Sequence, residues 1–139
     1  MTDAAEDGTH IAPDASDARG ARAAREVAIV TRRSARFYVL GGAGDGAPPA
    51  ELWIVLHGYG QLAGRFIRHF RAIATPHRTV VAPEALNRFY LAGPGGTRSH
   101  AEAPVGATWM TREDRDREVA DQHAYLDAVL AAVSPAGPP

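Results

Sequence analysis

The sequence contains neither cysteine nor lysine, and each absence excludes a class of site. Without cysteine there is no disulfide framework, no thiolate zinc site and no cysteine nucleophile. Without lysine there is no P-loop, because that phosphate-binding motif requires one. All 15 basic residues are arginines, and 16 acidic residues bring the net charge to -1. This balance indicates no basic surface for nucleic acids or anionic membranes.

Long apolar runs are absent as well. No stretch approaches the roughly 18 residues that a membrane span needs. Residues 1–25 mix acidic residues with arginine and have no apolar core, so they match neither a signal nor a transit peptide. Such a segment cannot bury enough surface to offset its ordering entropy. We therefore expect a disordered tail over residues 1–25, one domain over residues 26–139, and a cytoplasmic protein.

Metal and cofactor motifs are also missing. The six histidines show no H-E-x-x-H or similar paired spacing. Gly42 and Gly44 lie in a polar loop without a following apolar helix, which does not fit a dinucleotide-binding fingerprint. Acidic residues and arginines alternate over residues 112–121, a pattern typical of a solvated helix face with weak local ion pairs. We therefore expect neither a metal nor a cofactor.

The apolar pattern of the first half predicts a mixed α/β fold. Residues 27–31 and 37–40 predict two short strands, most simply a hairpin. The nearly continuous apolar run over residues 51–56 is typical of a strand covered on both faces, as in a parallel sheet. Helical spacing follows over residues 62–73, and residues 79–82 predict a second buried strand. Together the last three segments form a βαβ unit, whose crossover should be right-handed.

The second half predicts an irregular segment followed by one helix. Residues 83–110 are expected to be irregular, with proline and glycine in the middle. Residues 111–114, Thr-Arg-Glu-Asp, resemble a helix capping box. After them, residues that form one face of a helix recur at helical spacing: Val119, Gln122, Leu126, Val129, Leu130 and Val133.

The turn over residues 57–61, His-Gly-Tyr-Gly-Gln, is the strongest candidate for chemistry. Its glycines let backbone N–H groups point into the crevice at the carboxyl edge of the sheet, where α/β folds bind ligands. Donors placed there can hold the oxyanion of an acyl-transfer transition state. The same glycines also fit a simple tight turn, and the spacing alone leaves both interpretations open.

Three ordered segments resemble the phospholipase/carboxylesterase family of α/β-hydrolases, which are serine esterases and thioesterases. Residues 52–60, Leu-Trp-Ile-Val-Leu-His-Gly-Tyr-Gly, resemble the strand and oxyanion turn of the family. Residues 81–86, Val-Ala-Pro-Glu-Ala-Leu, resemble the next strand and the loop leaving it. Residues 106–109, Gly-Ala-Thr-Trp, resemble the loop before the following helix. The resemblance covers roughly residues 51–133 and implies the N-terminal part of an α/β-hydrolase sheet.

Carried over to this chain, the resemblance implies an oxyanion donor at the backbone N–H of Tyr59. His57, Gly58 and Gly60 would shape the turn. Trp109 would lie near the acyl or leaving-group side of the substrate pocket, although a packed aromatic is the alternative. His57 fits a turn-stabilising role better than that of a base, because the catalytic histidine of the family comes late in the chain.

The catalytic triad of the family is missing from this chain. The nucleophile of the family lies in a G-x-S-x-G elbow and is followed by an acid and a histidine. No serine here lies in such an elbow: Ser16, Ser34, Ser99 and Ser134. We therefore expect no catalytic residue in this chain. We interpret it as the N-terminal part of a hydrolase for small carboxylic esters or lysophospholipids, inactive by itself. The alternative is a non-catalytic protein that binds a partner through an exposed sheet edge.

The strand order that the resemblance implies places residues 52–56 at an edge. In the family this strand lies between the strand here at residues 79–82 and the nucleophile strand, which this chain lacks. The resulting edge would have unpaired backbone groups and only Glu51 as a charged residue. We therefore expect the isolated chain to be insoluble, to self-associate through residues 52–56, or to be only loosely folded.

Overall fold

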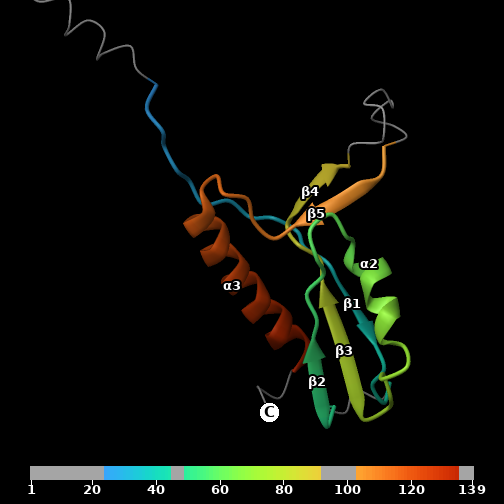
Figure 1. Cartoon of the computed structure of the whole chain (residues 1–139). Helices are drawn as coiled ribbons and strands as arrows, with labels where there is room; N and C mark the ends of the chain where they lie inside the picture. The colour runs from blue at the N-terminus through green and yellow to red at the C-terminus, as the bar shows by residue number, and fades with distance from the viewer. Residues whose placement is uncertain (1–23, 45–48, 92–102, 135–139) are drawn as a thin grey trace, which may run out of the picture. The chain divides into compact units, whose positions relative to one another are not determined.

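The computed structural model describes residues 24–44, 49–91 and 103–134. The chain divides into two units, residues 1–33 and 34–139. In the first unit, the described residues 24–33 form no helix or strand, and the tail predicted over residues 1–25 lies almost wholly outside the described residues. The second unit contains the helices and strands that the structure describes (Figure 1).

A mixed three-stranded sheet organises the second unit. Its strands are β1 (Phe37–Leu40), β3 (Arg78–Pro83) and β2 (Glu51–Ile54), in that order across the sheet. The central strand β3 pairs antiparallel with β1 and parallel with β2 (Figure 1). The parallel pair confirms the predicted βαβ unit. However, β2 is an edge strand with three exposed residues, so the prediction that both of its faces are covered is wrong.

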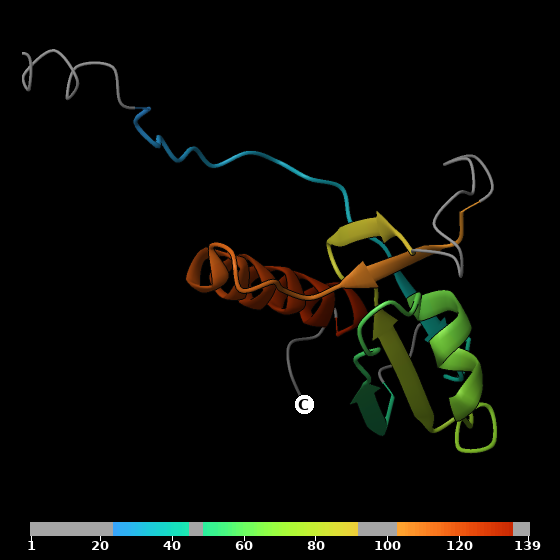
Figure 2. The same cartoon turned by 45° about the horizontal axis from the view of Figure 1, so that its top comes forward.

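The connection between β2 and β3 is a short α-helix, α2 (Ala63–Phe66), that continues as a 3₁₀ helix, η1 (Ile67–Phe70). It covers one face of the sheet, where Ala63 and Ile67 pack with Val80 and Ala82 of β3 (Figure 2). The helical spacing predicted a longer α-helix. Gly64 lies within the α-helical segment and lowers its helix propensity, which agrees with an α-helix of only four residues.

The predicted strand over residues 27–31 is not formed, and the predicted hairpin is therefore wrong. Val30 in this segment is fully exposed. A tight hairpin needs glycine, asparagine or aspartate in its turn, and residues 32–36, Arg-Arg-Ser-Ala-Arg, contain none of them. Alternating apolar residues predict a strand only where a neighbouring strand can pair with them, and β1 pairs with β3 instead.

A second sheet lies in the segment that was predicted to be irregular. It consists of β4 (Asn87–Tyr90) and β5 (Val105–Thr108), which pair antiparallel. Both strands have only four residues, which is too short for a clear alternating pattern in the sequence. The residues 92–102 between them lie outside the described residues.

The long C-terminal helix is confirmed as α3 (Arg115–Val133), and Gln122 and Val129 on its predicted face are buried. The predicted capping box is wrong. The helix begins after Asp114, which adopts the left-handed conformation with φ of 52°, and no side chain caps it. Thr111 instead donates its N–H to the carboxylate of Glu118, at 2.7 Å. Within the part of the chain that the structure describes, no helix has the length and apolar character of a membrane span.

Candidate functional site

The candidate turn follows β2 and has the geometry of a type II β-turn. The N–H of Gln61 donates to the carbonyl of Gly58 at 3.2 Å, which closes a turn of four residues. Gly60 has a φ of 73°, whereas Tyr59 has a negative φ. Positive φ at the third position alone defines type II and favours glycine there. The side chain of Gln61 also accepts the N–H of Gly58, at 2.8 Å.

Strand β5 holds the turn in place through its backbone. The N–H of Gly60 donates to the carbonyl of Ala107 at 2.9 Å, and the N–H of Ala107 donates to the carbonyl of Gln61 at 3.1 Å. Gly106 lies directly against Gly60, because a Cβ on Gly106 would be 2.5 Å from the Gly60 carbonyl oxygen. The turn is therefore fixed by a strand that is more than forty residues away in the sequence.

Tyr59 lies at the tip of the turn. Its side chain is 76% exposed, and its ring centroid is 5.1 Å from that of Phe89 in β4. The backbone N–H groups of Gly58, Gly60 and Gln61 all have acceptors. The Tyr59 N–H has none among the residues that the structure describes. The donor that the resemblance implies for the oxyanion is thus unengaged among the described residues, whereas the other N–H groups of residues 58–61 are hydrogen-bonded.

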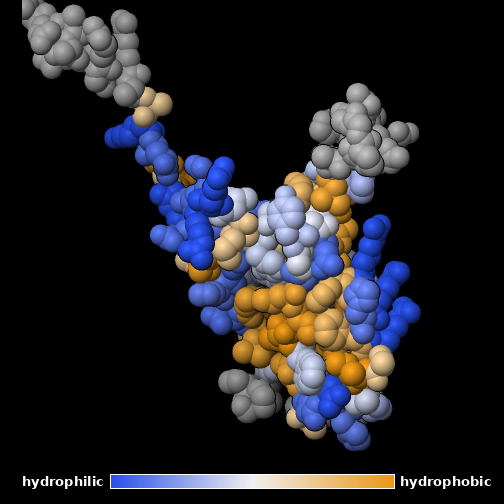
Figure 3. Space-filling view, viewed as in Figure 1, coloured by the Kyte–Doolittle hydropathy of each residue, from blue (hydrophilic) through white to orange (hydrophobic). Residues whose placement is uncertain are grey.

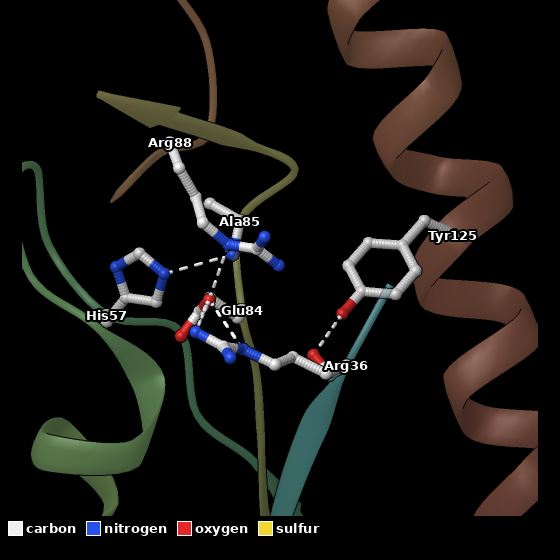
Figure 4. A network of polar contacts seen from close by, with 6 residues as sticks. All are labelled: Arg36, His57, Glu84, Ala85, Arg88 and Tyr125. Atoms are coloured by element: carbon white, nitrogen blue, oxygen red, sulfur yellow. Dashed lines mark hydrogen bonds and ion pairs between the residues drawn. The ribbon is translucent and has the colours of Figure 1, made fainter. Parts of the chain in front are cut away.

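His57 is buried beneath the turn and stabilises it. The N–H of Ala85 donates to Nε2 at 3.0 Å, so Nε2 carries the lone pair (Figure 4). The proton is then on Nδ1, which donates to the carbonyl of Gly58 at 2.9 Å. Both ring nitrogens are hydrogen-bonded to backbone groups. His57 therefore has the geometry of a turn-stabilising residue and not that of a base.

Trp109 lies against His57. Its indole N–H donates to the His57 carbonyl at 2.8 Å, and the two ring centroids are 5.2 Å apart. The structure therefore brings together the two residues that the sequence placed near the turn. The polar group of Trp109 is used within the protein, and the exposed part of its half-buried ring is what remains for contact with a substrate.

Glu84, directly after β3, is a residue that sequence reasoning missed. Its side chain is fully buried, and Oε1 accepts from Nε of Arg36 and from Nε of Arg88, each at 2.8 Å (Figure 4). Arg36 precedes β1 and Arg88 lies in β4, so this carboxylate joins three segments. The second oxygen, Oε2, is buried without a donor among the described residues. The available signal was an acidic residue directly after an apolar strand.

Tyr125 extends this network to α3. Its hydroxyl donates to the Arg36 carbonyl at 2.9 Å (Figure 4). Burial raises the pKa of the Tyr125 hydroxyl above its ordinary value. The hydrogen bond to Glu84 raises the pKa of the Arg36 guanidinium. Arg36 and Glu84 thus link α3 to the loop after β3. In the same loop, the N–H of Ala85 donates to the ring of His57.

Among the described residues, the turn has an unengaged backbone donor, and no serine lies in a nucleophile elbow. Ser34 precedes β1 and Ser134 follows α3, so neither lies in an elbow between a strand and a helix. Ser16 and Ser99 are outside the described residues. The described ranges also contain no group of three or more side chains that could hold a metal ion.

Comparisons of the chain with protein-family models, with curated proteins and with solved structures give no match. The likeness to the esterase family therefore rests on the three sequence segments alone.

Proposed function

We propose that this chain is the oxyanion-turn part of a serine hydrolase that acts on carboxylic esters. The observation that carries the proposal is the unengaged N–H of Tyr59 in a turn fixed by β5 and His57. Oxyanion stabilisation is most effective when the donor is already in position and does not reorganise during the reaction. Backbone hydrogen bonds on both sides of Tyr59 meet this requirement.

The remaining catalytic groups would come from polypeptide that this chain does not contain. They are the serine in its elbow, the second oxyanion donor, the acid and the base. One donor stabilises charge but creates none, so the chain is proposed to be inactive by itself. The exposed aromatic ring of Tyr59, which lies at a tilt against Phe89, favours an ester with an apolar acyl or alcohol group.

The purified chain is expected not to hydrolyse short acyl p-nitrophenyl esters and not to be labelled by a fluorophosphonate. Enzymes that lose a triad member keep a residual rate of about 10³–10⁴ over water, but they retain the rest of the site. Here the second oxyanion donor is missing as well. Ester turnover that persists through further purification, together with fluorophosphonate labelling, would contradict the proposal.

Replacing Tyr59 with proline is expected to weaken the binding of a tetrahedral oxyanion at the turn. Proline lacks the N–H but suits the second position of a type II turn, so Tyr59→Pro removes the donor and preserves the fold of the turn. The measurement is a titration of the ¹⁵N-labelled chain with methylphosphonate, followed by NMR. Loss of one charge-assisted hydrogen bond, about 1.5–3 kcal/mol, weakens binding by at least roughly tenfold.

Tyr59→Ala is the matched control, because it removes the ring but keeps the N–H. It should bind methylphosphonate nearly as the natural sequence does. The amide resonance of Tyr59 should shift during the titration. The amide resonance of Gly60 should not, because its N–H is hydrogen-bonded to the Ala107 carbonyl. Equal binding by Tyr59→Pro and the natural sequence would overturn the role of this donor, and so would shifts that spare the Tyr59 amide.

A second function is favoured by a different observation, the exposure of β2. Trp53 is 42% exposed and Ile54 is 37% exposed on this edge strand. A non-catalytic protein that binds a partner by strand addition would use such an edge. The DNA downstream of the Pro139 codon separates the two proposals. A strand followed by G-x-S-x-G in any frame supports the hydrolase, and no trace of one supports the binding protein.

A further inference from the structure

The pairing of β2 with β3 shows which backbone groups of β2 point away from β3. The N–H of Glu51 donates to the carbonyl of His77 at 3.0 Å, and the N–H of Val55 donates to the carbonyl of Val81 at 2.9 Å. Backbone groups alternate in direction along a strand, so the groups of the intervening even-numbered residues point away from β3. Leu52 and Ile54 of β2 form this outward row, and the same alternation continues it to Leu56, two residues beyond the end of the strand.

Both faces of this edge carry exposed apolar side chains. Trp53 is 42% exposed on the face that α2 covers, and Leu56 is 49% exposed on the opposite face. Figure 3 shows apolar residues gathered around β2 and β3 on the face in view. Natural edges are usually protected by charge, proline or a bulge, and residues 52–56 contain neither charge nor proline. The carboxylate of Glu51 is already paired with Arg78.

We propose that β2 pairs antiparallel with β2 of a second copy of this chain, which joins the two sheets into one. In a two-fold pairing centred on Ile54, this residue lies opposite the same residue of the second copy, and Leu52 lies opposite Leu56. All outward groups of the row then have partners. On the other face Trp53 lies opposite Val55, so apolar side chains meet across the symmetry axis on both faces.

A second copy fits this edge because β2 is complementary to itself. Every pair in the two-fold register from Leu52 to Leu56 is apolar, and no charge faces a like charge. The other edge strand of the sheet, β1, also has four residues. The N–H of Glu84 donates to the carbonyl of Arg36, so Phe37 and Val39 are the outward residues of β1. The inference uses only strand pairing and exposure, and it does not rest on the hydrolase proposal.

The absence of cysteine allows a single introduced thiol to report this contact. Directly opposed Cα atoms in a hydrogen-bonded antiparallel pair are about 5.5 Å apart, within the range of about 4.4–6.8 Å for a disulfide. We expect Ile54→Cys to form a disulfide-linked dimer under mild oxidation. Val39→Cys is the matched control, because Val39 is 51% exposed on the opposite edge. It should form little disulfide-linked dimer under the same conditions.

Sedimentation equilibrium provides the second measurement. The natural chain should behave as a dimer of 14.7 kDa protomers that dissociates on dilution. Because the N–H of Ile54 points outward, Ile54→Pro preserves the β2–β3 ladder while it removes a donor from the edge. This variant should be monomeric with an unchanged far-UV circular dichroism spectrum.

Three outcomes would overturn the inference. They are a natural chain that is monomeric at all concentrations, equal or greater cross-linking of Val39→Cys, and a dimer that survives in folded Ile54→Pro. If Ile54→Pro fails to fold, the comparison of the two cysteine variants decides the question by itself.

Discussion

Replacing Gly106 with alanine is expected to lower the free energy of unfolding by roughly 2–3 kcal/mol, at the upper end for overpacking. A Cβ at this position would lie 2.5 Å from the carbonyl oxygen of Gly60 and 2.7 Å from its Cα. Neither β5 nor the turn can move away easily, because the hydrogen bonds of Gly60 and Gln61 with Ala107 hold them together. Relief of the clash therefore breaks these bonds and displaces the Tyr59 N–H.

Gly58→Ala is the matched control within the same turn. Its Cβ would meet only the end of the flexible Gln61 side chain, at 3.3 Å, and Gly58 does not have a positive φ. Urea denaturation followed by circular dichroism measures both variants, at equal protomer concentration because association contributes to stability. Equal stability of the two variants would show that β5 does not hold the turn as described. Gly106→Ala should also bind methylphosphonate less tightly.

Replacing Glu84 with glutamine is expected to cost about 2–3 kcal/mol of unfolding free energy. The carboxylate is fully buried, and one of its oxygens accepts from Arg36 and Arg88. Charge-assisted hydrogen bonds contribute about 1.5–3 kcal/mol each, and breaking a buried pair costs about 3–5 kcal/mol. The expected cost lies toward the lower end of these ranges. The reason is that the side chains of Arg36 and Arg88 are 51% and 41% exposed, so water hydrates them when the contact is lost. The amide also replaces a carboxylate whose second oxygen, Oε2, is buried without a partner among the described residues.

Glu51→Gln is the matched control, since Glu51 also pairs with an arginine but its side chain is 52% exposed. Little change in stability is expected at neutral pH. The hydrogen bond from Arg78 lowers the pKa of the Glu51 carboxyl. The Glu51–Arg78 pair therefore stabilises the folded state fully at pH values above the ordinary carboxyl pKa. This stabilisation is lost as the pH falls through the lowered pKa of Glu51 in the folded state. If Glu84→Gln is no more destabilised than Glu51→Gln, Glu84 does not join the three segments as proposed.

Local sequence patterns were sufficient for the βαβ unit and for α3. The apolar run of β2, the glycine turn and the apolar positions from Ala63 to Phe70 follow one another within about twenty residues. The edge position of β2 also agrees with the prediction. The hairpin and the irregular segment were wrong because strand pairing joins distant residues. Neither the pairing of β1 with β3 nor that of the short β4 and β5 leaves a periodic signal.

The candidate site divides in the same way. The sequence by itself determined that the chain lacks thiol and lysine chemistry, that a glycine turn follows β2, and that no serine lies in a nucleophile elbow. It also placed His57 and Trp109 near that turn through the resemblance.

Only the tertiary structure decided which donor of the turn stays free and what holds the others. Ala85 and Trp109 bind His57 across 28 and 52 residues of sequence, and Arg36 reaches Glu84 across 48. The physical reason is that a buried backbone N–H or C=O needs a hydrogen-bond partner. A local sequence pattern does not identify a partner that comes from a distant strand. The Tyr59 N–H has no acceptor among the described residues, whereas β5 and the Gln61 side chain accept the N–H groups on either side of it.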